Sequence, residues 1–209
     1  MNRLAAIISN VFHPLYMPVL GMAIILNGND IYRLIVSPAL AWFIYLVFLV
    51  FTVLFPVFTI LGLRVTKVVS SIHLPTREER RIPLLLGTLF FMMAYWLVRS
   101  VNEIMTINFI MVAGVFTLVL LLILNNFIKL SVHMAGIGGL TGMLTAIAGT
   151  FTLNSDWYLF GAVLASGLTG FARLQLKAHS VSEVALGYCV GFLSQYVLLN
   201  FLIQRAYFL

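Results

Sequence analysis

The stretch RLQLKAHSVSE, residues 173–183, places two basic residues, an imidazole and a carboxylate between two long apolar runs. Ionisable groups at a membrane boundary are costly unless they are paired or hydrated, so such a cluster indicates a functional site. Two further polar clusters, residues 129–133 and 77–81, also lie at the ends of apolar runs. We expect the three clusters to converge into one anion-binding pocket.

The composition indicates an integral membrane protein. Of the 209 residues, 62% are hydrophobic and 9% are charged, whereas about half of a soluble domain is apolar and about a quarter is charged. No linker divides the chain, so residues 1–209 are predicted to form one domain. The net charge of +6 is spread over loops, which argues against nucleic acid and favours phosphate head groups as partners. The single cysteine, Cys189, excludes a disulfide framework.

Seven apolar runs approach the roughly twenty residues that cross a bilayer. We therefore expect an all-α bundle of six to seven transmembrane helices with the active site at one membrane face. The first run is predicted to be an uncleaved helix that breaks at His13-Pro14. The polar connection 64–83 is expected to be a loop or surface helix, with a capping box in TREE, residues 76–79. The runs cover residues 4–26, 35–63, 84–98, 104–128, 134–153, 157–171 and 182–203.

The order of the runs allows the three clusters to meet. Two runs separate residues 77–81 from residues 129–133, and two more separate residues 129–133 from residues 173–183. An even number of crossings therefore returns the chain to the same face each time. Glycines and other small residues in the fifth and seventh runs let helix backbones approach closely in lipid. The fifth helix is therefore expected to be central in the bundle, and the sixth run repeats the same feature.

The converging residues suit phosphoryl transfer. Arginine forks match phosphate oxygens, and lysine adds a point charge. Two histidines, His133 and His179, can divide the labour of attack and proton donation. Glu183 lies four residues after His179, on the same face of a helix, where it can orient the ring. The scheme needs no metal and no other cofactor. The cationic residues expected around this space are Arg77, Arg80, Arg81, Lys129 and Arg173.

The pattern Arg173-x5-His179-x3-Glu183 resembles the third motif of the type 2 phosphatidic acid phosphatase superfamily, Ser-Arg-x5-His-x3-Asp. Ser131-Val-His133 resembles its second motif, Pro-Ser-Gly-His. The resemblance extends by order from residue 77 to the C-terminus, although identity is confined to a few positions.

That resemblance implies a role for each matching residue. His179 is the expected nucleophile that becomes phosphorylated, and Glu183 is expected to orient it. His133 is expected to protonate the leaving group, and Arg173 to bind phosphate. The implied substrate is a lipid phosphomonoester or diphosphate, such as phosphatidate, phosphatidylglycerophosphate, an isoprenoid diphosphate or lipid A, and the implied location is the bacterial inner membrane.

The chain departs from the family pattern at several positions. The nearest match to the first motif, Lys-x6-Arg-Pro, is RRIP, residues 80–83, which lacks the lysine; Lys129 is a candidate for the missing ammonium. Ala172 replaces the serine before the motif arginine, and Val132 replaces the glycine between Ser131 and the histidine. Glutamate replaces aspartate at the end of the third motif. Altered substrate preference and weakened catalysis are both compatible with these changes.

Each residue also has a neutral interpretation. Arg173 can snorkel at the interface, Glu183 can cap a helix, and His133 can bond a carbonyl. His13 is interpreted as structural. Two rival functions remain: a non-catalytic binder or transporter of phosphorylated lipid, and a cytochrome with haem between two histidines.

The charge distribution leaves the membrane side of the site open. The face with the clusters holds nine of the twelve Lys and Arg residues, which favours the cytoplasm. Five of the nine are assigned to the site itself. Without them, four Lys and Arg residues remain on this face and three lie on the opposite face. The sequence also leaves the oligomeric state open.

Overall fold

The computed structural model describes residues 2–28, 30–101, 104–148 and 156–207, and within these ranges the regular structure is helical without strands. The prediction of an all-α fold is therefore confirmed. Five segments are long and apolar enough to cross a membrane, and Val132–Ala148 is a shorter apolar helix. The five segments are Asn2–Gly28, Pro38–Val65, Arg77–Val101, Met105–Leu124 and Val181–Ala206.

The first segment breaks where the sequence predicted. Helix α1 (Asn2–Val11) ends before His13-Pro14, a 3₁₀ turn η1 follows at Pro14–Tyr16, and α2 (Met17–Gly28) continues the rod. Proline lacks the N–H that would continue the helix. The Nδ1 atom of His13 accepts a hydrogen bond from the Leu15 N–H at 3.4 Å and thereby caps the turn. At the break, the ring of His13 contacts the ring of His133 at the start of helix α8 (Val132–Ala148).

The second rod is continuous but irregular. After the short α3 (Asp30–Ile35), helix α4 (Pro38–Phe48) is capped by Ser37, passes through a π-helical turn η2 (Leu49–Leu54) and becomes α5 (Phe55–Val65). Pro56 lies just after the π-helical turn and cannot donate to the normal hydrogen-bond ladder. The widened turn absorbs this loss without breaking the rod.

Helix α6 (Arg77–Val101) begins earlier than expected. A helix does begin at the capping box predicted in residues 76–79, but the predicted boundary at Leu84 is wrong, because this helix and the third run are one. Thr76 caps the helix by accepting from the Glu79 N–H at 3.3 Å. The helix then continues through Pro83, although an internal proline removes one backbone hydrogen bond and its ring crowds the carbonyl group four residues earlier. The polar cluster 77–81 is therefore the first turn of a long helix.

The remaining helices are α7 (Met105–Leu124), α8, α9 (Asp156–Gln175) and α10 (Val181–Tyr207). Helices α8 and α10 touch backbone to backbone, as their glycines predicted. A Cβ atom at Gly187 would lie 2.6 Å from the Ser131 carbonyl oxygen, and one at Gly191 would overlap the Ala135 carbonyl oxygen. The end of the fifth predicted run, residues 149–153, lies outside the described residues.

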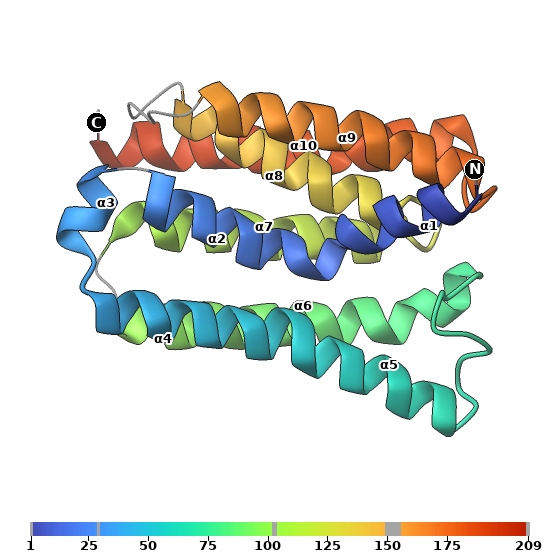
Figure 1. Cartoon of the computed structure of the whole chain (residues 1–209). Helices are drawn as coiled ribbons and strands as arrows, with labels where there is room; N and C mark the ends of the chain where they lie inside the picture. Colours follow the sequence, from blue (N-terminus) through green and yellow to red (C-terminus); the bar gives the residue numbers. More distant parts are fainter. Residues whose placement is uncertain (1, 29, 102–103, 149–155, 208–209) are drawn as a thin grey trace.

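The rods alternate in direction, so three connections meet at one end of the bundle (Figure 1). The start of α6, the α7–α8 connection and the α9–α10 turn all lie at that end, together with the N-terminal helix α1. Hydrogen bonds join them: Arg77 binds the Phe127 carbonyl oxygen at 2.7 Å, and the Ser131 N–H donates to the Glu183 carbonyl oxygen at 3.2 Å. The prediction that the three polar clusters share one end is confirmed.

Candidate functional site: an arginine and histidine cluster

The α9–α10 turn explains the spacing between Arg173 and His179. Helix α9 closes with Lys177 in the left-handed region at φ 52°, and the Ala178 N–H donates back to the Arg173 carbonyl oxygen at 3.2 Å. A left-handed residue at this position reverses the chain at the end of a helix. The reversal returns His179 to the level of the last turn of α9, beside Arg173.

His179 is held by the first turn of α10. Its side chain is 1% exposed, and its Nδ1 atom lies 2.8 Å from Oε2 of Glu183. The same carboxylate oxygen accepts from the Ser180 N–H at 3.3 Å, and the Ser180 hydroxyl accepts from the Glu183 N–H at 3.3 Å. Glu183 therefore caps the helix and contacts the imidazole at once, so the two interpretations of this residue are compatible.

The contact with Glu183 fixes the proton on the ring. A carboxylate only accepts hydrogen bonds, so Nδ1 of His179 carries the proton and Nε2 holds the lone pair. Burial lowers the pKa of His179 to about 4, and the nearby charges of Arg80 and Arg173 also lower it, while the hydrogen bond that the ring donates to Glu183 opposes the shift. The ring is therefore neutral at ordinary pH, as a nucleophile must be.

Arg173 reaches across to the N-terminal helix. Its Nη1 atom donates to the Ser9 hydroxyl at 2.8 Å, and its Nε–H is buried without a hydrogen-bond partner in the part of the chain that the structure describes. Its charge acts on His133, His179 and Arg80. A buried, unpaired donor on a charged group is unfavourable, and a bound anion would satisfy it.

Arg80 is the second buried cation of the cluster. The residue is 7% exposed, and its Nε and Nη1 atoms donate to the carbonyl oxygens of Leu74 and Leu130, each at 2.9 Å. These bonds tie the start of α6 to the α7–α8 connection. Arg80 also interacts electrostatically with Arg173 and Glu183. Its Nη2 atom makes no hydrogen bond to the described residues, so it has donors left for an anion.

His133 begins helix α8 and packs against another histidine. Its ring centroid lies 4.9 Å from that of His13, with the planes at 79°. Electrostatic interactions link His133 to His179 and to Arg173, which places the two predicted histidines in one cluster. Ser131 is fully buried beside them, and its hydroxyl accepts from the Met134 N–H at 3.5 Å as the cap of α8.

The other predicted cations are less closely associated with the cluster. Arg77 donates to the carbonyl oxygens of Asn126 and Phe127, so it fastens the α7–α8 connection. Arg81 is exposed and acts on Glu78. Lys129 is half-buried and makes no side-chain hydrogen bond to the described residues. Phosphate binding by these three residues remains a prediction that no contact in the structure supports.

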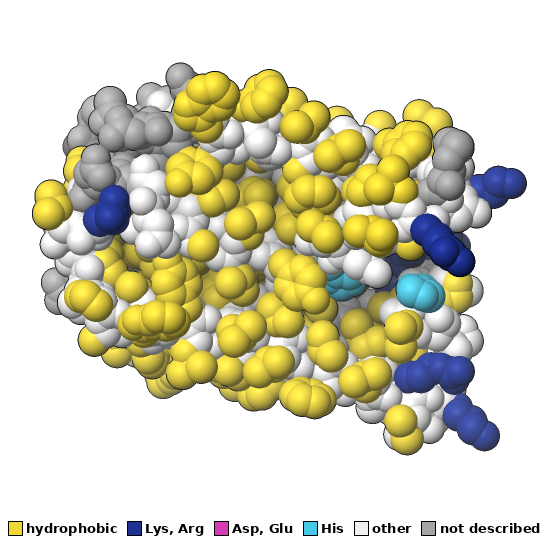
Figure 2. Space-filling view, viewed as in Figure 1, with side chains coloured by type: hydrophobic (Ala, Val, Ile, Leu, Met, Phe, Trp, Pro, Cys, Tyr) yellow, Lys and Arg dark blue, Asp and Glu magenta, His cyan; other side chains and the backbone are white. Residues whose placement is uncertain are grey.

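The cluster lies at the polar end of an otherwise apolar surface. Figure 2 shows several Lys, Arg and His side chains at the end where α9 finishes, and hydrophobic side chains over most of the same face. Among the described residues, no group of three or more His, Cys, Asp or Glu side chains could hold a metal ion. The arrangement offers unpaired guanidinium donors beside a neutral, oriented imidazole, which suits a phosphate group.

The sequence analysis missed two residues of the cluster, Ser9 and His13. Ser9 is 4% exposed and receives the hydrogen bond from Arg173, while His13 contacts His133. Both lie on α1 and the turn after it, four residues apart. A serine and a histidine spaced by one helical turn in an apolar run were the available indication. Their partners lie more than a hundred residues away, so the sequence alone did not connect them.

Comparisons with protein-family models, with curated proteins and with solved structures gave no match for this chain. The chemistry of the cluster is therefore the basis for a functional assignment.

Proposed function

We propose that the protein is a membrane lipid phosphatase that hydrolyses a phosphomonoester or diphosphate head group through a phosphohistidine at His179. The observation that carries the proposal is the buried, unpaired Nε–H of Arg173 beside an imidazole that Glu183 orients. Guanidinium groups without a paired acid need an anion, and the free Nε2 of His179 supplies a nucleophile for phosphorus.

In the proposed reaction Arg173 and Arg80 bind the phosphate oxygens. Nε2 of His179 attacks phosphorus, and the bond from phosphorus to the lipid oxygen breaks. His133 gives its proton to that oxygen. Burial and the surrounding positive charge both disfavour a protonated imidazole at this position, and the bound phosphate offsets the charge. Water then attacks the phosphohistidine, His133 accepts its proton, and inorganic phosphate leaves.

We also propose seven membrane crossings, at the upper limit of the predicted six to seven. The five long apolar segments supply five of them. Helices α8 and α9 run alongside these segments in Figure 1 and supply the other two. The cluster would then lie at one membrane face. The bacterial inner membrane is the proposed location, and the charge distribution leaves the side of that membrane undecided.

A phosphate-release assay tests the proposed activity. Purified protein is offered phosphatidate, phosphatidylglycerophosphate, undecaprenyl diphosphate and lipid A, and each assay is repeated with His179→Ala. We expect release from at least one lipid and its loss in the variant, with the thermal unfolding of the variant unchanged. Undiminished release by His179→Ala would reject the assignment. His73→Ala, on the exposed polar loop, serves as the matched control and should retain activity.

A non-catalytic binder of phosphorylated lipid is the second candidate, because Arg80 and Arg173 each combine anion-binding donors with structural hydrogen bonds. Such a protein would bind the lipid through Arg173 and release no phosphate. A haem protein, in contrast, would be coloured when purified.

A further inference from the structure

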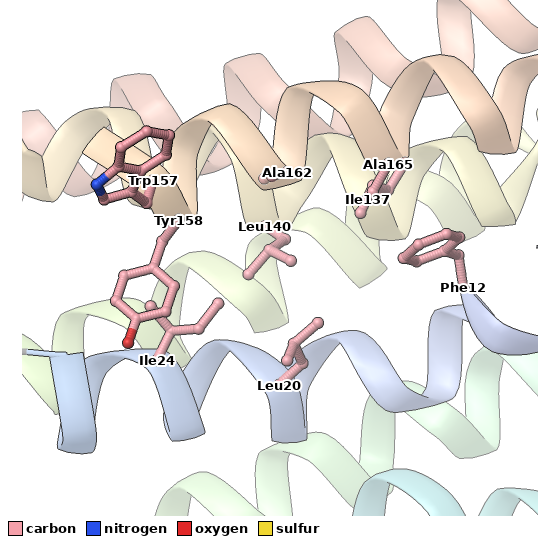
Figure 3. Close-up of a pocket in the computed structure, with 10 residues that line it drawn as sticks. Phe12, Leu20, Ile24, Ile137, Leu140, Trp157, Tyr158, Ala162 and Ala165 are labelled. Atoms are coloured by element: carbon pink, nitrogen blue, oxygen red, sulfur yellow. The ribbon is translucent and has the colours of Figure 1, made fainter. Parts of the chain in front are cut away.

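An apolar hollow of 180 Å³ lies between helices α2, α8 and α9 (Figure 3). Side chains from three helices line it: Leu20 and Ile24 from α2, Ile137 and Leu140 from α8, and Trp157 and Ala165 among those from α9. Every lining residue is apolar, aromatic or glycine. A hollow with such walls accommodates hydrocarbon and offers nothing to a charged group.

Small residues on α9 create the hollow. Gly161, Ala162 and Ala165 face it, and a Cβ atom added at Gly161 would have no neighbour within 4 Å. At the far end Tyr158 packs on the backbone of α2, where a Cβ atom at Gly28 would lie 2.8 Å from its ring. Trp157 and Ala165 are eight helical steps apart, which gives the hollow a length of roughly 12 Å at the helical rise per residue.

The opposite end of the hollow adjoins the arginine and histidine cluster. Phe12 closes this end, as Figure 3 shows. The next residue is His13, whose ring contacts His133. One helical turn earlier, Ser9 holds Arg173. The same short segment of chain therefore forms the wall between an apolar groove and a cationic site.

We propose that this groove binds the hydrocarbon tail of the lipid whose phosphate occupies the arginine and histidine cluster. The inference rests on the proposed function and adds the place of the tail. An amphiphile with one anionic and one apolar end matches the two adjoining surfaces, since phosphate pairs with arginine and hydrocarbon fills the hollow. The groove directs one chain along α9 away from the reacting phosphorus.

A second apolar hollow provides an internal comparison. It has a volume of 470 Å³ and is lined by residues of α6 alone, among them Leu89, Met93 and Trp96. None of its lining residues belongs to the cluster or adjoins it in sequence. Ordinary membrane lipid should contact both hollows alike, whereas the phosphorylated substrate should favour the groove beside α9.

Photocrosslinking with the full chain in phosphatidylcholine nanodiscs tests the proposal. One probe is phosphatidate with a diazirine in its acyl chain, and the other is phosphatidylcholine with the same chain. Labelled peptides are mapped by mass spectrometry. We expect the phosphatidate probe to label residues 157–165 in clear excess over the phosphatidylcholine probe, with no such excess at residues 89–97. Equal labelling of residues 157–165 by the two probes would overturn the proposal.

Two glycine variants on the same helix sharpen the test. Gly161→Leu fills the groove, whereas Gly167→Leu, whose Cβ position is equally open, lies outside it. We expect the first to lower the excess labelling about tenfold, as the loss of a few buried methylenes predicts, and the second to leave it unchanged. Leu20→Trp fills the groove from α2 and replaces Gly161→Leu if that variant does not fold. Excess labelling that survives a filled groove would refute the proposal.

The same preparations separate this inference from the proposed activity. If the labelling follows the prediction but no phosphate is released, the groove binds the lipid tail and the proposed phosphatase activity is rejected. If phosphate is released from phosphatidate but Gly161→Leu leaves the excess labelling unchanged, the phosphatase activity stands and the proposed tail-binding groove is rejected.

Discussion

The α9–α10 turn and the α7–α8 connection contain similar residues and arrange them differently. Each carries a basic residue, a serine and a histidine just before or at the start of a helix. In the first, His179 is almost fully buried and its Nδ1 atom contacts Glu183. In the second, His133 packs edge-on against His13, and no carboxylate contact is found for it within the described ranges.

The difference indicates a division of roles. An imidazole with a carboxylate on one nitrogen is locked in a single tautomer, which suits a nucleophile. His133 lacks that partner, and its proposed part is to give a proton to the leaving oxygen and to accept one from water. The close contact of α8 with α10 is what brings these two arrangements together, since it places Ser131 against Glu183.

Separating the two helices should have the largest effect. Gly191→Leu drives a side chain into the Ala135 carbonyl group, and overpacking of this kind costs about 3 kcal/mol or more where backbones touch. We expect a large drop in the thermal unfolding temperature in detergent and loss of phosphate release. Gly167→Leu is the matched control, because its Cβ position is open. Equal stability of the two variants would show that the contact does not hold the turns together.

Removing the second histidine should affect substrates unequally. His133→Ala is expected to lower kcat about 100-fold or more for an alkyl phosphate, because general acid catalysis contributes at least that much. The effect should nearly vanish for p-nitrophenyl phosphate, whose leaving group needs no proton. Steady-state kinetics with both substrates provide the measurement. A uniform loss on both would instead assign His133 to binding.

Replacing the carboxylate should have a smaller effect. Glu183→Gln keeps the size of the side chain and removes its charge, and we expect kcat to fall about 10- to 100-fold, the usual effect of losing such a supporting partner. Ser180→Ala is the control, because it loses the helix cap, worth about 1 kcal/mol of stability, and leaves the imidazole contact intact. If both variants lost kcat equally, Glu183 would act only through the cap.

The smallest effect is a shift in pH dependence. With the pKa of His179 at about 4 instead of 6.5, the acid limb of kcat/KM should fall near pH 4, since this limb reports the free enzyme. In Glu183→Gln it should move lower, because the negative charge that the variant removes raises the pKa of His179. The low pKa also makes folding less favourable as the pH falls from 6.5 to 4, because the unfolded chain gains a proton there. A limb near pH 6.5 would contradict the burial of this ring.

Much of the fold could be predicted from local sequence. Apolar runs predicted the helices, and the His13-Pro14 pair predicted the break. Small residues in the fifth, sixth and seventh runs predicted close helix contacts, but not that α8 and α10 would be partners. The start of the third transmembrane run was misplaced because the polar residues 64–83 were assigned to a connection, although the helix that Thr76 caps continues from Arg77 through Pro83.

The site could be predicted only where spacing is local. His179 and Glu183 are four residues apart, so helical geometry alone pairs them. Ser9 and Arg173 are paired by the packing of α1 on α9, which no local pattern encodes. Arg80 is buried in the cluster, whereas Arg77 fastens the α7–α8 connection. This difference depends on which side of the helix faces the bundle, and the local sequence does not distinguish the two arginines.

The central claim is that His179 attacks the phosphorus of a bound lipid phosphate, and trapping the intermediate tests it most directly. Radiolabelled substrate is mixed rapidly with the protein, the reaction is quenched in base, where phosphohistidine survives, and the labelled peptide is mapped. We predict label on the peptide that contains His179 and none in His179→Ala. Turnover with label on the peptide that contains His133, or with no labelled peptide at all, would contradict the assignment.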